Sequence, residues 1–279
     1  MWKVSTEQIG VRVRELALDI AINLSSLVEN DLKAALAVEV FPPARRILEQ
    51  ILENARLAAA THLPLCQDTG LIQILLELGP GIYLSGPALS KVVEVAVRSA
   101  YADGFLRKSA CQPLSRENSG DNTPASVEVV YSENEGLRLT VLAKGGGCDN
   151  TSRLMMLKPS EGWAGVRRVV LTAVAEAGPG ACPPFYLGIA VGGTFESAPR
   201  LAKWALMDLG AGETPEEPGL AAELLEAVNA TGLGPAGFGG RTTALGLALK
   251  IYPAHIASLP VAVNINCHSF RLRREKLAL

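Results

Sequence analysis

Aromatic residues are scarce in this sequence, and neither sign of charge dominates it. Phe, Trp and Tyr make up 5% of the 279 residues, although hydrophobic residues as a whole make up 48%. A sizeable core must therefore be built mainly from Ala, Val, Leu and Ile. Lys plus Arg number 26 and Asp plus Glu 28, for a net charge of -2. This balance argues against a nucleic-acid or polyanion binder, which usually carries a basic surplus, and leaves room for a small anionic substrate.

Long apolar runs and a targeting segment are also absent. Runs such as residues 169–175 fall far short of the ~20 residues that span a bilayer. The first four residues contain neither an apolar stretch nor a small-residue cleavage site. We therefore expect a soluble, cytoplasmic protein. The five cysteines, an odd number scattered along the chain, make a poor disulfide framework, so they are free thiols, metal ligands or catalytic residues.

Hydrophobic periodicity predicts helices first and then strands alternating with helices. One N-terminal helix follows a capping box at Ser5, and a second begins at Pro42. Later helices are predicted from residue 85, from residue 160, and over 196–209 and 219–230. Short apolar runs predict strands at 71–78, 127–131, 137–143, 186–191, 244–251 and 259–265.

These elements predict an α+β fold. We expect a helical N-terminal part, residues 1–62, packed on a mixed, mostly antiparallel sheet domain at 63–270, with 1–279 forming a single domain. Residues 133–136 are expected to join two strands as a hairpin. The basic stretch 271–276 is expected to be a solvated end or linker.

Three cysteines lie in polar or proline-rich loops: Cys66 in CQDTG, Cys182 in ACPP and Cys267 in NINCH. Taken singly, each is as well explained by a turn or a buried structural thiol. Taken together, three thiolates could hold a four-iron cluster that leaves one iron without a protein ligand. Such an iron is a Lewis acid, which suits reversible hydration because hydroxide is otherwise a poor leaving group. Spacing alone leaves a three-ligand zinc site equally open.

Other polar loops suit an anionic substrate. Arg107 follows a predicted helix and could bind a carboxylate with its guanidinium fork, although a surface arginine is the default interpretation. Lys144 precedes three glycines that would let backbone N–H groups approach an anion, or simply form a turn. His255, between two predicted strands, is either a proton carrier or a satisfied loop histidine.

Seven stretches, in order along residues 66–270, resemble the class I, iron–sulfur-dependent fumarate hydratase family and its tartrate dehydratase branch, specifically their alpha subunit. They are CQDTG, RENSGDNTPA, KGGGCDN, ACPPF, GGT, GFGGRTTAL and HIASLPVAVNINCHSF. The resemblance implies a [4Fe–4S] cluster ligated by Cys66, Cys182 and Cys267. It also implies substrate contacts from Gln67, Asp68, Arg107 and Gly146, to which we add Lys144 from its place before the three glycines. His255 and Asp68 are the catalytic candidates.

The same resemblance implies a partner. In this family the catalytic base and further substrate-binding cations come from a C-terminal domain or a separate beta subunit, and this sequence ends shortly after Cys267. We therefore expect a heteromer with a beta subunit, a heterotetramer, that hydrates fumarate to malate in the tricarboxylic acid cycle. Dehydration of L-tartrate or another hydroxy-dicarboxylate is the close alternative. Cys148 favours it slightly, because fumarases more often carry Ser there. A non-catalytic metal- or cluster-binding subunit and a zinc hydrolase are alternatives from other classes.

Overall fold

The computed structural model describes residues 2–277, whose contacts group them into two compact units. The first unit contains residues 2–25, 55–146 and 271–277, and the second contains 26–54 and 147–270. Each unit is therefore assembled from segments that are distant in sequence. The fold is α+β, as predicted, whereas the description of 1–279 as a single domain stays a prediction.

The N-terminal part is helical, as predicted, after a short strand β1 (Trp2–Ser5). Ser5 caps α1 (Thr6–Ile22), because its side-chain oxygen accepts the N–H of Glu7 at 3.1 Å. Helices α2 (Ser26–Val38) and α3 (Pro42–Thr61) follow, and α3 begins at the predicted proline pair. The sequence interpretation did not identify α2 as a helix.

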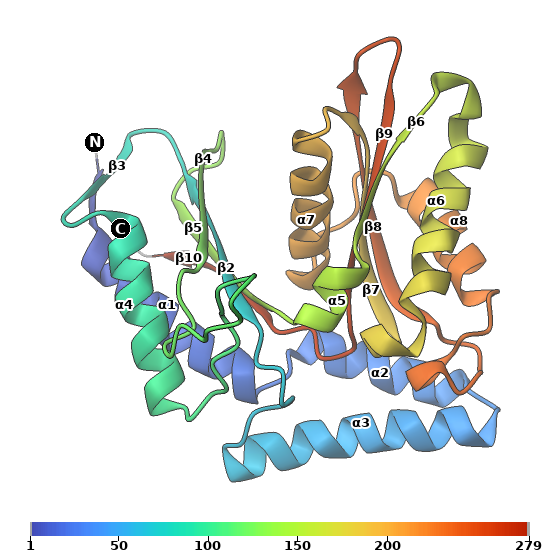
Figure 1. Cartoon of the computed structure of the whole chain (residues 1–279), viewed down its shortest axis with the longest axis horizontal. Helices are drawn as coiled ribbons and strands as arrows, with labels where there is room; N and C mark the ends of the chain where they lie inside the picture. Colours follow the sequence, from blue (N-terminus) through green and yellow to red (C-terminus); the bar gives the residue numbers. More distant parts are fainter. Residues whose placement is uncertain (1, 278–279) are drawn as a thin grey trace. The chain divides into compact units, whose positions relative to one another are not determined.

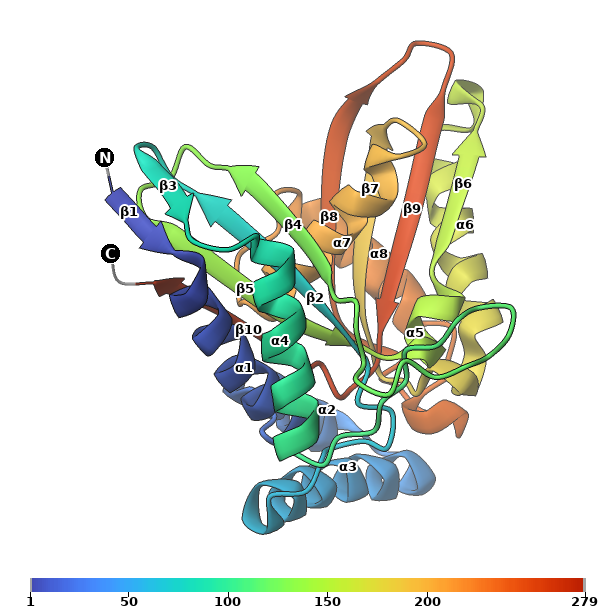
Figure 2. The same ribbon diagram turned by 60° about the vertical axis from the view of Figure 1, so that its left-hand side comes forward.

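The first unit is a four-stranded sheet with two helices on one face (Figure 2). The strand order is β10-β5-β2-β4, formed by Leu272–Leu277, Leu137–Lys144, Leu71–Leu78 and Ser126–Tyr131. Alternate side chains of β2, such as Ile72, Ile74 and Leu76, pack under α1 and α4 (Leu89–Asp103). Strand β3 (Ile82–Ser85) pairs in parallel with β1 at one side.

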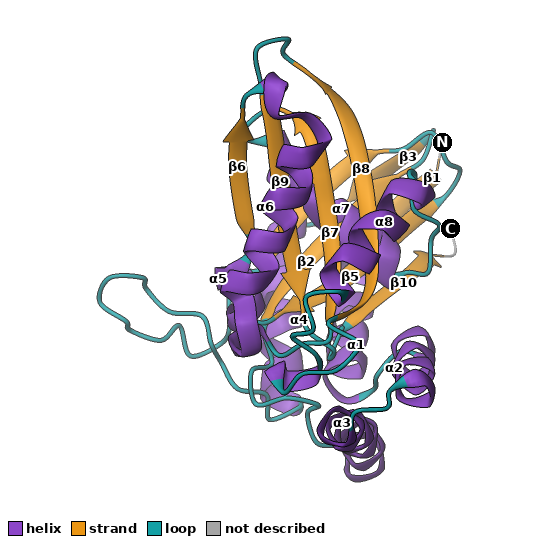
Figure 3. Ribbon diagram, turned by 90° about the vertical axis from the view of Figure 1, so that its right-hand side faces the viewer, coloured by secondary structure: helices purple, strands orange, loops and turns teal. Residues whose placement is uncertain are grey.

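The second unit is a sheet covered by helices on both faces (Figures 1 and 3). Its strand order is β6-β9-β7-β8, formed by Arg153–Leu157, Leu259–Asn266, Phe185–Gly193 and Ala244–Ala254. Along β7, Leu187 and Ile189 face α6 (Gly162–Ala177) and α8 (Pro218–Asn229), while Ala190 faces α7 (Ser197–Gly210). Successive side chains of β7 thus pack against helices on opposite faces of the sheet. The strand is therefore buried on both faces, and its sequence is a continuous apolar run.

Short helical pieces complete this part of the chain. Helix α5 (Gly146–Thr151) follows β5, and three 3-10 turns lie at Pro159–Glu161, Gly178–Ala181 and Pro235–Gly237. In the part of the chain that the structure describes, no helix combines the length and the apolar character needed to cross a bilayer.

Two expectations from the sequence are wrong. Strands β4 and β5 do not form a hairpin, because β2 lies between them, antiparallel to β5 and parallel to β4. The inner positions go to β2 and β5 because most of their residues are buried, whereas β4, at the edge, is mostly half-exposed or exposed. The basic stretch after Phe270 is not a solvated linker, since β10 pairs with β5 from Leu272 to Leu277. The mixed and mostly antiparallel character of the sheets is confirmed.

Candidate active site

The loop that carries Asp68 is fixed against the end of β5 in the first unit. Strands β2 and β5 are antiparallel with Leu71 opposite Lys144, so the start of one strand lies beside the end of the other. Gly70 has a φ of 80°, and a Cβ there would lie 2.8 Å from the Lys144 carbonyl oxygen, so only glycine fits. Asp68 Oδ1 accepts the N–H of Gly70 at 3.0 Å, and Oδ2 accepts the N–H of Gly146 at 2.8 Å.

The segment that carries Arg107 is tied to the same loop. The Thr69 hydroxyl donates to the Arg107 carbonyl at 2.7 Å. The buried Tyr101 hydroxyl lies 2.7 Å from the Gly70 carbonyl oxygen and 3.1 Å from that of Thr69. Burial raises the pKa of Tyr101 to about 12, so its hydroxyl remains a hydrogen-bond donor at neutral pH. The first unit therefore brings the loops of Asp68 and Arg107 and the start of α5 together.

A buried arginine that the sequence interpretation assigned to the basic tail also supports this loop. Arg271 is 2% exposed, and its Nη1 donates to the Asp68 carbonyl at 2.6 Å. Its Nε has no hydrogen-bond partner among the described residues. The neighbouring Lys144 is 3% exposed. Arg271 beside Asp68 and Lys144 at the end of β5 are two buried cations of the first unit, a balance that suits an anionic ligand. In the sequence, the position of this arginine directly after the Cys267 motif was the sign that it could belong to the site.

Of the other predicted substrate contacts, Gln67 and Arg107 have exposed side chains and Gly146 is exposed at the start of α5. Exposure leaves all three accessible to a ligand. The helix that begins at Gly146 is a single short piece, so the predicted glycine turn is in part helical.

Cys182 and Cys267 lie at the same end of the sheet in the second unit. Cys182 comes shortly before β7 and Cys267 directly after β9, and these antiparallel strands pair Tyr186 with Asn266. His268 joins the two loops, since its Nδ1 lies 3.1 Å from the Cys182 carbonyl oxygen. Cys182 has a φ of 54° and is exposed. A left-handed conformation is unfavourable for a residue other than glycine by about 1–3 kcal/mol, and such strain gathers at functional positions.

The remaining cysteines differ in their surroundings. Cys66 and Cys111 are half-buried, whereas Cys148 is 4% exposed and its Sγ lies 3.6 Å from the Ala181 carbonyl oxygen. No cysteine is part of a disulfide. Within residues 2–277 no three His, Cys, Asp or Glu side chains gather closely enough to hold a metal ion. The donor chemistry nevertheless fits a soft metal, because the thiols of Cys66, Cys182 and Cys267 are all on loops and all partly accessible.

His255 lies at the other end of the same sheet from Cys267. It follows β8 and precedes β9, whereas Cys267 follows β9, so the whole strand separates them. Eight residues of strand span about 26 Å at the usual rise per residue. The Ala257 N–H donates to His255 Nδ1 at 3.1 Å, which places the proton of the neutral ring on Nε2. One chain therefore does not bring His255 to the loops of Cys182 and Cys267.

Comparison with known proteins identifies the class of protein to which this chain belongs. The model of the family described as "Fumarate hydratase (Fumerase)" matches residues 11–276. A Methanocaldococcus jannaschii protein, provisionally named L(+)-tartrate dehydratase subunit alpha, is 37% identical over 277 residues, covering 96% of each chain. The L(+)-tartrate dehydratase subunit alpha of Escherichia coli K12 is 28% identical over 282 residues, covering 97% of this chain and 93% of that one.

These similarities cover almost the whole chain, and the expected family is confirmed. The chain belongs to the fumarate hydratase family of hydro-lyases.

Proposed function

We propose that this chain is the alpha subunit of a hydro-lyase that dehydrates L(+)-tartrate. The observation that carries the proposal is the near full-length similarity to two chains that bear this name, 37% and 28% identical. The first unit supports it, because the Asp68 loop, the Arg107 segment and the start of α5 are joined by hydrogen bonds. This order of preference reverses the sequence-based expectation, which placed fumarate first.

The residues of the first unit have the chemistry that a hydroxy-dicarboxylate requires. Arg107 binds one carboxylate through its guanidinium fork, and Gln67 donates amide hydrogens beside it. Lys144 and the N–H groups near Gly146 contribute positive potential for the second carboxylate. Asp68, held by Gly146 and Gly70 at its two oxygens, keeps one orientation and exchanges a proton with a substrate hydroxyl.

We further propose that Cys66, Cys182 and Cys267 ligate a [4Fe–4S] cluster. The three thiols come from three separate loops, and Cys182 occupies a strained backbone conformation that a ligand role would explain. When bound, such a cluster supplies a Lewis-acidic iron that lacks a protein ligand and favours loss of a hydroxyl group. The contribution of the chain itself is to present the Cys182 and Cys267 thiolates on loops anchored by β7 and β9, and the Cys66 thiolate on the loop before β2.

A beta subunit completes the proposed site. Both named relatives carry the designation subunit alpha, which supports a multisubunit enzyme, and a heterotetramer is our proposal for the assembly. The beta subunit would supply the base and the further cations that the described residues do not provide. His255 belongs to this site only if a second copy of the chain contributes it, because it lies one strand length from Cys267 in its own chain.

Hydration of fumarate to malate is the second candidate, and the description of the matching family favours it. Its chemistry is the reverse of a hydroxy-acid dehydration and requires the same groups. The two activities are separated by assaying the chain, co-expressed with the proposed beta chain under anaerobic conditions, on tartrate, fumarate and malate. Faster turnover of L(+)-tartrate by at least tenfold in kcat/KM supports the first candidate, and the opposite ratio supports the second.

A further inference from the structure

A long connection joins α4 to β4 (Figure 2). Asn122, a buried residue of this connection, holds it from within. Asn122 is 1% exposed and has a φ of 63°, a left-handed conformation that asparagine tolerates better than most residues. Its own N–H donates to the Ser119 hydroxyl oxygen at 3.1 Å. The polar atoms of a buried side chain are nearly always hydrogen-bonded, so the partners of the Asn122 amide indicate its role in the structure.

The Asn122 side chain bridges the two loops of the proposed site. Its Oδ1 accepts the N–H of Ser109 at 2.7 Å and that of Ala110 at 3.1 Å. Its Nδ2 donates to the Gly70 carbonyl at 3.1 Å. Ser109 lies two residues after Arg107, and Gly70 lies two residues after Asp68. The Asn122 side chain therefore links the backbone near Arg107, the candidate carboxylate-binding residue, to the backbone near Asp68, the candidate acid–base residue.

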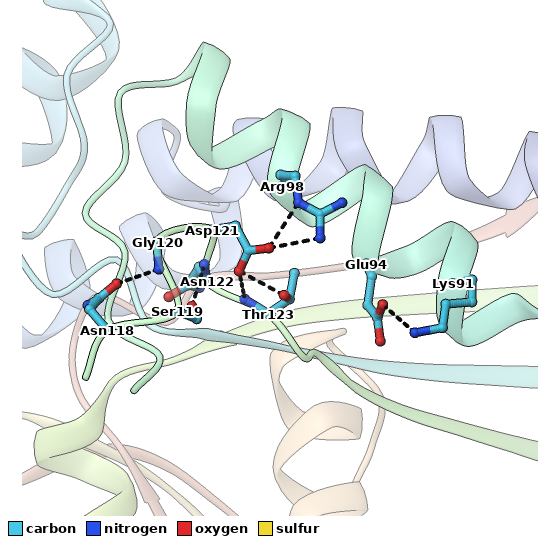
Figure 4. Close-up of polar contacts among 9 residues, drawn as sticks. All are labelled: Lys91, Glu94, Arg98, Asn118, Ser119, Gly120, Asp121, Asn122 and Thr123. Atoms are coloured by element: carbon cyan, nitrogen blue, oxygen red, sulfur yellow. Dashed lines mark hydrogen bonds and ion pairs between the residues drawn. The ribbon is translucent and has the colours of Figure 1, made fainter. Parts of the chain in front are cut away.

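Asp121, directly before Asn122, is anchored to Arg98 of α4 and also holds Thr123, directly after Asn122 (Figure 4). Asp121 accepts hydrogen bonds from Arg98 Nε at 2.9 Å and lies 2.8 Å from Arg98 Nη2. The other oxygen of Asp121 accepts the N–H of Thr123 at 3.0 Å and its hydroxyl at 2.8 Å. This bracing fixes the backbone of Asn122, so its amide group has one orientation available rather than several.

We propose that Asn122 is a positioning residue that sets the spacing between Arg107 and Asp68, and so the length of dicarboxylate that the site accepts. The inference rests on the proposed function, because it takes Arg107 and Asp68 as groups that bind the substrate. Arg107 takes one carboxylate, and the subsite for the other, at Lys144 and the N–H groups near Gly146, is fixed to Asp68 through its hydrogen bond with the Gly146 N–H. The two carboxylates of a small dicarboxylate are separated by a fixed number of carbons. A rigid distance between the binding groups therefore selects one chain length, whereas a loose distance accepts several.

Three variants of the co-expressed alpha–beta complex separate positioning from stability. Asn122→Gly removes all side-chain bonds while tolerating the positive φ. Asn122→Asp keeps the acceptor for Ser109 and Ala110 but puts an oxygen against the Gly70 carbonyl oxygen. Val97→Ala deletes methyl groups from a fully buried position in the same unit and serves as the control matched for stability.

Inhibition constants for malonate, succinate and glutarate are measured on each complex, beside KM, kcat and Tm. For Asn122→Gly we expect the inhibition constant of the best inhibitor to rise about tenfold and the preference for chain length to flatten, with KM rising more than kcat falls. Asn122→Asp should show the same direction. Val97→Ala should lower Tm with unchanged constants. A Tm loss in Asn122→Gly with an unchanged length profile would show a merely structural role and overturn the proposal.

Hydrogen exchange of the full-length chain tests the bridge independently of turnover. Asn122→Gly should speed exchange at Ser109 and Ala110, which lose their acceptor, and also at Gly70 and Gly146, which bond to Asp68 across the bridge. Unchanged exchange at Gly70 and Gly146 would overturn the proposal even in an active enzyme. A wild-type complex without turnover would instead contradict the proposed function, while faster exchange at all four amides would still support Asn122 as the link between the loops.

Discussion

The Asp68 carboxylate accepts a hydrogen bond from the Gly146 N–H at 2.8 Å, although 78 residues separate them in sequence. The β2–β5 ladder causes this contact, because it places the start of one strand beside the end of the other. The two sequence motifs that carry these residues, CQDTG and KGGGCDN, therefore form one structural feature of the first unit.

Replacing Asp68 with Asn should reduce activity without unfolding the protein. The amide keeps the size of the side chain and one acceptor oxygen, but it cannot take up a proton as a carboxylate does. We expect kcat/KM of the alpha–beta complex to fall by at least about 100-fold, the usual scale for loss of a general acid–base group. Activity of Asp68→Asn within a factor of two of wild type would remove Asp68 from the catalytic candidates.

Serine substitutions should divide the cysteines into two groups. Cys66→Ser, Cys182→Ser and Cys267→Ser should lose the cluster, whereas Cys111→Ser and Cys148→Ser should retain about four irons per chain after anaerobic preparation. Cys148 is a useful control because a serine hydroxyl can donate to the Ala181 carbonyl oxygen as the thiol does. Iron and sulfide analysis is the measurement. Loss of iron in Cys148→Ser together with its retention in Cys267→Ser would contradict the ligand assignment.

Asp121 should stabilise the loop of Asn122 in a manner that depends on pH. Hydrogen bonds from the Thr123 hydroxyl and N–H, and then from Arg98, lower the pKa of Asp121 below its usual range. A lowered folded-state pKa contributes stability that is present above the unfolded pKa of about 3.9 and is lost as pH falls toward the folded value. The difference in unfolding free energy between wild type and Asp121→Asn should thus be constant above about pH 5 and shrink below about pH 4. A difference that grows on acidification would be inconsistent with this role.

The final strand should be needed for stability. Leu272 is 2% exposed where β10 pairs with β5, so Leu272→Ala should lower the free energy of unfolding by about 2–4 kcal/mol. Urea denaturation measures the change, and Leu277→Ala, at the half-buried end of the same strand, should have a smaller effect. Equal and negligible effects of both substitutions would indicate that this segment does not contribute to the fold of the first unit.

The same strand shows where reasoning from the sequence fails. A short apolar run and its bounding glycines predicted β2 at Leu71–Leu78 with its observed limits, because these signals are local. The basic residues of β10 gave no such signal, since their partners are remote: Arg273 pairs with Asp19 at 2.9 Å, and Arg274 donates to Thr140 at 2.7 Å. From the sequence alone, a run of charged residues is interpreted as solvated, because hydrogen-bond acceptors from distant segments are not apparent.

The candidate site likewise contains residues that the sequence indicated and residues that it did not. The family resemblance indicated Asp68, Arg107 and Gly146 as substrate-binding candidates, and in the structure hydrogen bonds join the segments that carry them. The supporting residues Asn122 and Arg271 were not predicted, because their importance depends on burial and on hydrogen bonds to backbone atoms of other segments. Such contacts leave no periodic trace in the sequence.

The most direct test of the central claim is the rate of oxaloacetate formation from L(+)-tartrate by the anaerobically reconstituted chain, with and without its co-expressed beta chain. We predict turnover by the complex and none by the isolated chain, because the described residues offer the clamp at Arg107, Asp68 and the thiolates but not the remaining cations and the base for the carbon-bound proton. A complex that turns over neither tartrate nor fumarate would contradict the account. So would an isolated chain that turns over tartrate as fast as the complex.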